Sequence, residues 1–524
     1  MSPTEPQSVI VIGGGFAGLA SAGLLAAAGH RVTLLEQGEH LGGRAGRLHR
    51  GGFSFDTGPS WYLMPEVFEH WFGLMGTSVQ RELDLVELET SYRTFFEGQP
   101  PVDLSPQTAA ATFESLEPGA GSRLRDYLAQ SSGNYQLALE HFLYDDFARP
   151  GNLAKGSILR RLPQLLPLLL RSLHDHGAAR FQDPRLRQLL GYPAVFLGSS
   201  PRRTPALYHL MSHLDLVEGV RYPRGGFSAL VDAMARTAEA AGVLLVTRAR
   251  VTELSTDGAD GAVSAVQWID EHNDTHRSPA QIVVGAADLH HLEHQLLPPA
   301  RRTRSKRQWN RADPGPSAVL LCLGIKGKLP QLEHHNLFFT RDWDENFSRI
   351  DSGRPLQAET SIYACMPSAT DDTVAPEGHE NLFVLIPAPA APSWGRGGAD
   401  GTGDTMVEQV AEAAIDQVAR WAGIDDLRQR IVVRQSFGPA DFAQNFGAWQ
   451  GGALGLAHTL GQSAFLRPGI RNPKVPGLYY AGSSVRPGIG IPMCLISAEL
   501  VAKAVAGVSA PGPLPLPVPA GEPS

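Results

Sequence analysis

Three features are scarce in this 524-residue sequence: cysteine, positive charge and long apolar runs. The three cysteines, Cys322, Cys365 and Cys494, are far apart and odd in number, which fits neither a disulfide framework nor a Cys-ligated zinc site. The 45 basic and 53 acidic residues leave a net charge of −8, which argues against a nucleic-acid partner bound through a broad basic face. The same balance argues against a membrane partner held mainly by polybasic attraction.

Long apolar segments are also missing. No run reaches the roughly 18–20 residues of a membrane-spanning helix, and the N-terminus lacks the positive region of a signal peptide, so neither is expected. The nearest approach is the leucine-rich segment Ile158–Leu173, which three arginines and two prolines interrupt. This segment is typical either of a helix lying in a membrane interface or of a core helix with charged ends. With 43% hydrophobic residues, the chain is expected to be a large, reduced, intracellular globular protein.

The first motif is a glycine turn between a strand and a helix. Val9–Ile12 predicts a buried strand, and a helix is expected from about 16 to 28. Between them, Gly13 allows a tight turn, Gly15 lets the backbone approach a pyrophosphate, and Gly18 permits close packing of helix on strand. Phosphates at this place would meet free N–H groups and the positive end of the helix dipole.

An acidic residue completes the dinucleotide pattern. The segment Arg31–Glu36 (RVTLLE) predicts the second parallel strand, and Glu36 at its end lies 18 residues beyond Gly18. Its carboxylate can accept hydrogen bonds from ribose hydroxyls and would repel a 2′-phosphate. The first strand, the helix, the second strand and the acidic residue follow one another at the spacing of this pattern, so the sequence predicts a dinucleotide-binding βαβ unit.

A second glycine turn favours a flavin over a nicotinamide cofactor. Gly42, Gly43 and Arg44 follow the acidic residue closely, so the chain can return to the same pyrophosphate and add a guanidinium fork. An exposed surface loop is the alternative reading of these three residues. Near the other end, Gly477–Gly482 and a Gly/Pro-rich loop precede a helix expected from about Met493. The start of that helix would face the flavin ring, whose anionic reduced form it would stabilise.

Two groups of histidines are candidates for metal ligands. His290 and His294 stand one helical turn apart, but Asp288 before them reads as a helix N-cap and the order is not HExxH. His334 and His335 are expected in a loop or at the surface. No metal site is predicted.

Together these segments resemble the FAD-dependent carotenoid desaturases, specifically the bacterial and fungal type of phytoene desaturase. The N-terminal motifs GGGFAGLASAGLLAAAGHRVTLLE, GGRAG and FDTGPSWYLMP are shared in outline with amine oxidases and protoporphyrinogen oxidase. More specific are YHLMSHLDLVEGVRYPRGGFSALVDAM, PSATDDTVAPEGHENLFVLIP, GGALGLAHTLGQSAFLRP and GLYYAGSSVRPGIGIPMCLISAELVA. The resemblance runs from about residue 9 to residue 506.

The resemblance implies non-covalent FAD and a set of residues that contact it. These are Gly13, Gly15, Gly18, Glu36, Gly43, Arg44, Val251, Gly482 and Met493. Relatives have been discussed as using an acid and an arginine in the helical region. Arg160 is the matching arginine and candidate catalytic residue, whereas Ser157 stands at the acid position. Trp61, Tyr62 and Met64 are candidate substrate-tunnel lining, with a plain core role as the alternative.

The activity implied is stepwise desaturation of phytoene to lycopene-type carotenes, by hydride transfer from the polyene to flavin N5. Oxygen or a quinone would accept the electrons, and the protein would lie peripherally on the cytoplasmic side of the membrane, touching its lipid surface. Alternatives within this chemistry are a later-step desaturase or isomerase acting on neurosporene or hydroxylated carotenoids. A flavin amine oxidase and a prenyl-binding chaperone on the same fold are more distant alternatives.

The expected fold is α/β, with a Rossmann-like FAD-binding domain of the amine-oxidase, two-dinucleotide-binding type. That domain is expected to be discontinuous, built from 1–110, 220–300 and 470–507. A helical membrane and substrate-entry subdomain is expected over 111–219, and a substrate-binding domain over 301–469. Residues 508–524 (VSAPGPLPLPVPAGEPS) are predicted to be a disordered, proline-rich tail.

Overall fold

The computed structural model describes residues 5–147, 163, 165–257 and 259–517. Its first sheet has five parallel strands in the order β19–β13–β1–β2–β9. These strands are β1 (Ser8–Ile12), β2 (Arg31–Leu35), β9 (Leu244–Val246), β13 (Ile282–Gly285) and β19 (Leu478–Tyr480). They come from three distant stretches of the chain, because parallel neighbours need crossover connections. The predicted α/β fold class is confirmed.

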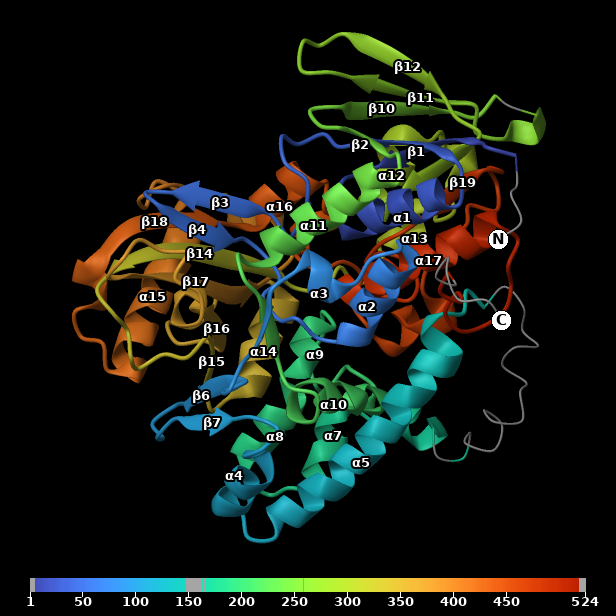
Figure 1. Cartoon of the computed structure of the whole chain (residues 1–524). Coiled ribbons are helices and arrows are strands. Elements are labelled where there is room, and N and C mark those ends of the chain that lie inside the picture. The colour runs from blue at the N-terminus through green and yellow to red at the C-terminus, as the bar shows by residue number, and fades with distance from the viewer. Residues whose placement is uncertain (1–4, 148–162, 164, 258, 518–524) are drawn as a thin grey trace.

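Both faces of this sheet are covered, which explains its apolar strands. Four of the five β1 residues and all four β13 residues are buried. Three helices, α1 (Phe16–Ala27), α11 (Phe227–Ala240) and α17 (Ile491–Val505), lie beneath the sheet in Figure 1. An antiparallel sheet lies above it, formed by β10 (Arg250–Ser255), β11 (Ala265–Ile269) and β12 (Thr275–Pro279).

A second large sheet has seven strands in the order β18–β14–β17–β16–β15–β6–β7, antiparallel except for the β15–β6 pair. Its strands are β6 (Tyr92–Phe96), β7 (Val102–Leu104), β14 (Ser317–Lys326), β15 (His335–Phe339), β16 (Ile362–Cys365), β17 (His379–Ala388) and β18 (Ile431–Phe437). Here the structure departs from the expected division, because β6 and β7 belong to the stretch 1–110 and yet pair with the second sheet. Helix α15 (Thr405–Ala422) packs its apolar side on this sheet.

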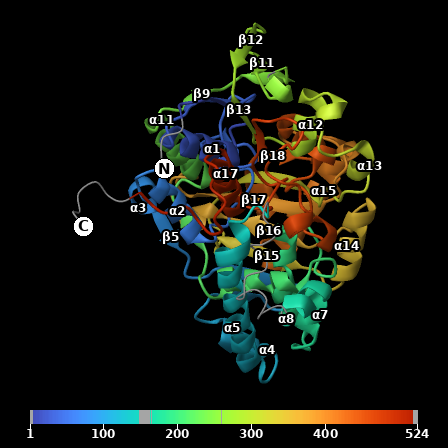
Figure 2. The same ribbon diagram turned by 90° about the vertical axis from the view of Figure 1, so that its right-hand side faces the viewer.

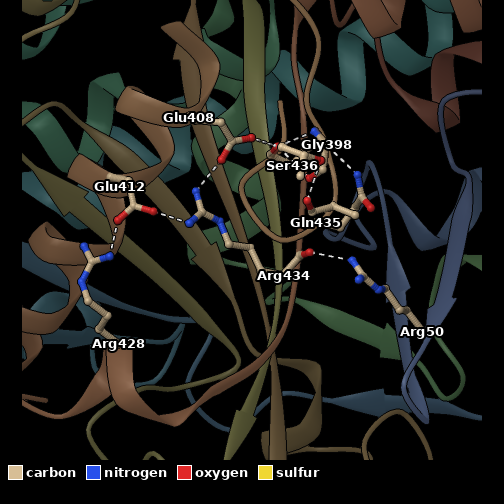
Figure 3. A network of polar contacts seen from close by, with 10 residues as sticks. Arg50, Gly398, Glu408, Glu412, Arg428, Arg434, Gln435 and Ser436 are labelled. Carbon is tan, nitrogen blue, oxygen red and sulfur yellow. Dashed lines mark hydrogen bonds and ion pairs between the residues drawn. The ribbon is translucent and has the colours of Figure 1, made fainter. Parts of the chain in front are cut away.

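Half-buried and exposed ion pairs join α15 to the strand beside it. The guanidinium of Arg434 on β18 reaches Glu408 and Glu412 of α15, and Glu412 also contacts Arg428 (Figure 3). The backbone carbonyl of Arg434 accepts a 2.7 Å hydrogen bond from Arg50. This network joins an early hairpin, a helix and an edge strand, so the second sheet has a defined outer border.

A third, mainly helical region around α5 (Ala120–Ala138) lies at the bottom of Figures 1 and 2. Further helices and two hairpins connect the sheets. The hairpins are β3 (Arg47–Arg50) with β4 (Phe53–Asp56), and β5 (Leu85–Glu87) with β8 (Arg221–Pro223). The helices are α2 (Pro65–Leu74), α3 (Val79–Glu82), α4 (Ala109–Leu116), α5 (Ala120–Ala138), α7 (Leu173–Ala178), α8 (Pro184–Gly191), α9 (Pro193–Phe196), α10 (Met211–Leu216), α12 (Leu289–Leu296), α13 (Lys306–Trp309), α14 (Trp343–Ser352) and α16 (Pro439–Phe446). Arg160 and Ser157 lie outside the described residues.

Two sequence-based expectations concern the surface. Among the helices of the described ranges, none is long and apolar enough to cross a bilayer. The described part of the predicted tail, 508–517, is not free: the Leu514 N–H donates to Glu499 at 2.5 Å, and Lys503 donates to the Gly512 carbonyl at 2.7 Å. Buried charges on α17 need partners, and the backbone of this stretch supplies them.

Candidate active site

One cavity of about 490 Å³ connects the three regions of the molecule. The glycine turns of the parallel sheet and the start of α17 form one part of its wall. Strands β14 and β17 of the second sheet contribute Ala318, Leu320 and Leu385, and the helical region contributes residues such as Leu143 and Leu214. The cavity is therefore both a dinucleotide-type site and a largely apolar chamber.

The first glycine turn has the geometry that its sequence predicts. Gly13 adopts φ +102°, and its N–H donates to the Leu35 carbonyl at 2.8 Å, which ties the turn to β2. A Cβ on Gly18 would lie 1.8 Å from the Gly13 carbonyl oxygen, so only glycine allows this approach of helix to turn. Helix α1 begins after Gly15 without a side-chain cap, and its first residues, Phe16 and Ala17, line the cavity. Free N–H groups and the positive helix end thus face this space.

The acidic residue shapes the same turn. The Glu36 carboxylate accepts hydrogen bonds from the N–H groups of Gly14 at 2.6 Å and Gly38 at 2.7 Å, and it lines the cavity. Val251 on β10 lines the cavity as well, beside a bulge in the β10–β11 pairing.

The second glycine turn lies directly against the first. The Gly42 N–H donates to the Gly14 carbonyl at 2.8 Å, and a Cβ on Gly43 would lie 3.3 Å from the Gly15 Cα. Arg44 extends from this turn into the cavity wall, where Nη1 lies 3.4 Å from the Ser483 hydroxyl. Its Nε is buried without a hydrogen-bond partner.

The C-terminal segment closes the other side. Gly482 has φ +113°, and its N–H donates to Ser497 of α17 at 3.0 Å. Helix α17 starts after Gly490, again without a side-chain cap, and Met493 and Cys494 of its first turn line the cavity. Burial raises the pKa of the Cys494 thiol to about 11, which disfavours the nucleophilic thiolate at neutral pH.

Two polar residues that contact this segment, His458 and Arg467, belong to the motif GGALGLAHTLGQSAFLRP, which by itself gives neither of them a role. His458 lines the cavity; its Nε2 accepts from the Ile489 N–H at 3.1 Å, so Nδ1 carries the proton and donates to the Tyr208 hydroxyl at 2.7 Å. Arg467 is 1% exposed, and four backbone carbonyls, including those of Val485 and Leu456, surround its guanidinium. Burial lowers the pKa of Arg467 to about 10, so it keeps its charge at neutral pH. Only the fold brings these residues to the α17 loop.

The structure places the three candidate tunnel residues in two different environments. Trp61 and Met64 line the cavity, but Tyr62 is not among its lining residues. Its ring stacks on Phe68, with the centroids 4.3 Å apart, and the side chain is 1% exposed. The predicted lining role of Tyr62 therefore gives way to the core role, because consecutive side chains along this extended segment point in different directions.

These features fit FAD. Two uncapped helix starts offer N–H donors on one cavity, two glycine turns leave room for a close backbone approach, and the buried Arg44 Nε is an unused donor at the same wall. The anionic pyrophosphate needs such donors, and the apolar part of the wall suits an isoalloxazine ring.

The two groups of histidines differ in how well their positions agree with the sequence-based expectation. Asp288 caps α12 by accepting from the His290 and His291 N–H groups, as predicted, and the rings of His290 and His294 stack with centroids 4.2 Å apart. His334 lies in the bend before β15, as a loop residue, but His335 is in the strand, and both are buried, at 3% and 0% exposed, so the expected surface position was wrong. His335 is the first residue of β15 and stands opposite Cys365 of β16 in the seven-stranded sheet.

Comparison with known proteins defines the class. The family model for flavin containing amine oxidoreductases matches residues 16–506. A carotenoid 3,4-desaturase of Haloarcula japonica is 42% identical over 508 residues, covering 96% of this chain and 99% of the relative. A zeta-carotene-forming phytoene desaturase of Myxococcus xanthus is 33% identical over 504 residues, covering 95% and 93%. An oxidoreductase structure from Methanosarcina mazei superposes with a TM-score of 0.59 at 16% identity, over 95% and 100% of the two chains.

The fold and the site thus define an FAD-dependent oxidoreductase. Within that class the chain belongs to the flavin containing amine oxidoreductase family and, more narrowly, to the carotenoid desaturases. The predicted resemblance and the predicted FAD cofactor are confirmed.

Proposed function

We propose that this chain desaturates a linear carotenoid and that its main reaction is dehydrogenation at the 3,4 position of an already unsaturated carotene. The observation that carries the reaction type is the single cavity, in which glycine turns of the dinucleotide type and a wall of aliphatic side chains meet. The observation that favours the 3,4 position is the 42% identity to the carotenoid 3,4-desaturase along nearly the whole of both chains.

The roles of the chain's own residues follow from their positions. Bound FAD supplies a two-electron acceptor. The turns at Gly13–Gly18 and Gly42–Arg44 hold the pyrophosphate, Glu36 holds the ribose hydroxyls, and Val251 offers its backbone to the adenine. The uncapped start of α17 and the buried charge of Arg467 provide positive potential near Gly482 and Ser483. The aliphatic wall holds the polyene and excludes water, which is the main requirement when positive charge is delocalised along the substrate.

Phytoene is the second candidate substrate, since the Myxococcus xanthus relative is a phytoene desaturase. The two candidates share the chemistry and differ in which bond must lie beside the flavin. Oxygen or a quinone is the proposed final electron acceptor.

A peripheral membrane contact is part of the proposal. Exposed large apolar side chains in the described residues include Leu166 and Leu170 in the leucine-rich segment, and Leu460, Phe465 and Leu466 before β19. Arg486 donates to the carbonyls of both Phe465 and Asp146, so the second group adjoins the end of the α5 region. A carotenoid dissolved in a bilayer would reach the cavity most directly from such an apolar surface.

The test mixes FAD-loaded protein anaerobically with liposomes that contain lycopene, neurosporene or phytoene, one at a time. Flavin and polyene absorbance are followed together. Flavin bleaching with a red-shifted polyene spectrum on lycopene supports 3,4-desaturation. Bleaching on phytoene alone would replace it with the second candidate, and no bleaching with any carotenoid would overturn the proposed activity. Adding oxygen or a quinone afterwards identifies the acceptor by the return of the oxidised flavin spectrum.

A further inference from the structure

A buried group of three metal-ligating side chains lies behind the cavity wall. His334 Nε2 or Nδ1, His335 Nε2 or Nδ1 and Cys365 Sγ offer ligand atoms that lie within 4.8 Å of one another. All three residues are at most 3% exposed. They belong to adjacent strands, because His335 on β15 stands directly opposite Cys365 on β16 in the antiparallel register. The chain bends at His334, and the rings of His334 and His335 are 4.5 Å apart.

The hydrogen bonds leave one nitrogen of each ring unused. His334 Nδ1 lies 2.8 Å from the Thr370 hydroxyl, and His335 Nδ1 lies 2.7 Å from the Tyr363 hydroxyl. The Nε2 atoms of both rings are buried without a hydrogen-bond partner. These two nitrogens are therefore the ring atoms that are free to bind a ligand. The arrangement matches metal-binding histidines, in which one nitrogen coordinates the ion and the other donates its N–H to an oxygen.

We propose that His334, His335 and Cys365 form a zinc site, with Nε2, Nε2 and Sγ as ligands and Thr370 and Tyr363 orienting the two rings. Two imidazoles and a thiolate are the donor set that zinc prefers, and three protein ligands leave the fourth position to water. One ligand atom of each residue already lies within 4.8 Å of the other two, and coordination would bring these atoms to the closer spacing around a tetrahedral ion.

The ion would fix the wall of the substrate chamber. Trp61 stacks on His335 with the ring centroids 4.7 Å apart, and the Tyr363 hydroxyl bonds both His335 and Ser60. Trp61, Ser60 and Tyr363 all line the cavity. A zinc ion bridging β15 and β16 would therefore set the orientation of three side chains that meet the substrate. This site is separate from the FAD-binding residues, and its existence does not depend on which carotenoid the protein desaturates.

The experiment measures metal in the tag-free holoenzyme. Elemental analysis after gel filtration is expected to find about one zinc per chain. Replacing zinc by Co²⁺ is expected to give a thiolate-to-cobalt band in the near ultraviolet together with the visible bands of tetrahedral Co²⁺. Cys365→Ser removes the near-ultraviolet band. The flavin spectrum and the melting temperature of each variant show whether it is folded.

Two further variants separate coordination from general packing. Thr370→Val removes only a ring-orienting oxygen away from the cavity and is expected to weaken zinc affinity about 10–100-fold while FAD stays bound. The double variant His290→Gln/His294→Gln removes a second pair of close histidines and is expected to leave the zinc content unchanged. Holoenzyme without zinc that also fails to take up Co²⁺ would overturn the proposal. So would a cobalt spectrum that Cys365→Ser does not alter, since the ion would then be bound elsewhere.

Discussion

At the scale of single residues, the site contains two arginine side chains, Arg44 and Arg467, that have no carboxylate of the described residues within hydrogen-bonding distance. Arg44 has one long contact to Ser483, at 3.4 Å, and a 3.9 Å approach to Asp288, while its Nε has no partner. Arg467 is surrounded by carbonyls instead of carboxylates. Neither guanidinium is neutralised by a close acid, so both keep positive potential for an anionic ligand.

Arg44→Ala is therefore expected to weaken FAD binding. Charge-assisted hydrogen bonds of this type contribute about 1.5–3 kcal/mol, which corresponds to a rise in Kd of roughly 10–100-fold. Flavin fluorescence during titration of the apoprotein measures this Kd. Arg50→Ala is the control, because Arg50 contacts Asp400 and the Arg434 carbonyl far from the cavity. Equal affinities for Arg44→Ala and Arg50→Ala would contradict the role of Arg44.

A buried carboxyl makes stability depend on pH. Asp215 is 3% exposed, and burial raises its pKa to about 7 although the Tyr92 and Tyr192 hydroxyls donate to it at 3.1 and 2.5 Å. Between about pH 4 and pH 7 the folded chain holds a proton that the unfolded chain has lost, so the free energy of unfolding falls as pH rises through this window. The contribution of this one group to the slope is at most about 1.4 kcal/mol per pH unit.

Asp215→Asn is expected to remove that contribution, so the variant gains stability relative to the wild type as pH rises from 4 to 7. Urea unfolding at several pH values measures it. Asp126→Asn, at an exposed position of α5, should leave the slope unchanged. A wild-type slope retained by Asp215→Asn would show that the carboxyl is ionised throughout.

At the scale of secondary-structure elements, helix α1 must approach its own glycine turn closely. A Cβ at position 18 would lie 1.8 Å from the Gly13 carbonyl oxygen, and backbone cannot move away as a side chain can. Gly133 on α5 is the matched case, a helical glycine with nothing within 4 Å of its would-be Cβ.

Gly18→Ala is expected to lower the free energy of unfolding by at least about 1–3 kcal/mol and to abolish stable FAD binding. Gly133→Ala is expected to be neutral or to stabilise by up to about 1 kcal/mol, because alanine favours a helix over glycine. Denaturant unfolding and the flavin content after gel filtration measure the two effects. If both variants behave alike, close packing at position 18 is not what requires glycine.

At the scale of the whole molecule, three regions meet at one cavity and an apolar surface lies outside it. Phe465 is 60% and Leu466 50% exposed, in the segment next to the loop that leads to α17. If this surface contacts lipid, each side chain contributes its transfer free energy to membrane binding.

Phe465→Ser combined with Leu466→Ser is therefore expected to lower partitioning onto phosphatidylcholine liposomes by about 10-fold or more, because up to 1.5–3 kcal/mol is lost for each side chain. Flotation of the holoenzyme measures this. The control combines Leu244→Ser with Val432→Ser, which are 60% and 54% exposed on strands β9 and β18. A similar loss in both double variants would remove the reason to place the membrane contact at Phe465.

The sequence by itself determined the βαβ unit. The roles of Gly13, Gly15, Gly18 and Glu36 depend only on their spacing within one short segment of two strands, a turn and a helix. Helix α1 ends at Ala27 and β2 at Leu35, within a residue of what the pattern predicts. Resemblance supplied the desaturase family, since its motifs extend along almost the whole chain.

Only the tertiary structure decided which distant residues meet. The sequence places His334 and His335 in a loop or at the surface, whereas the fold buries both and sets His335 opposite Cys365. Tyr62 turns into the core, while Trp61 faces the cavity. His458 and Arg467 contact the loop before α17, which the hydrophobic pattern of the sequence does not predict. Strand β6, from the N-terminal part of the chain, pairs with β15 in the second sheet. The physical reason is that the hydrophobic pattern of the sequence specifies which faces of the helices and strands are buried. Which distant element each buried face packs against is specified by long-range pairing in the folded chain.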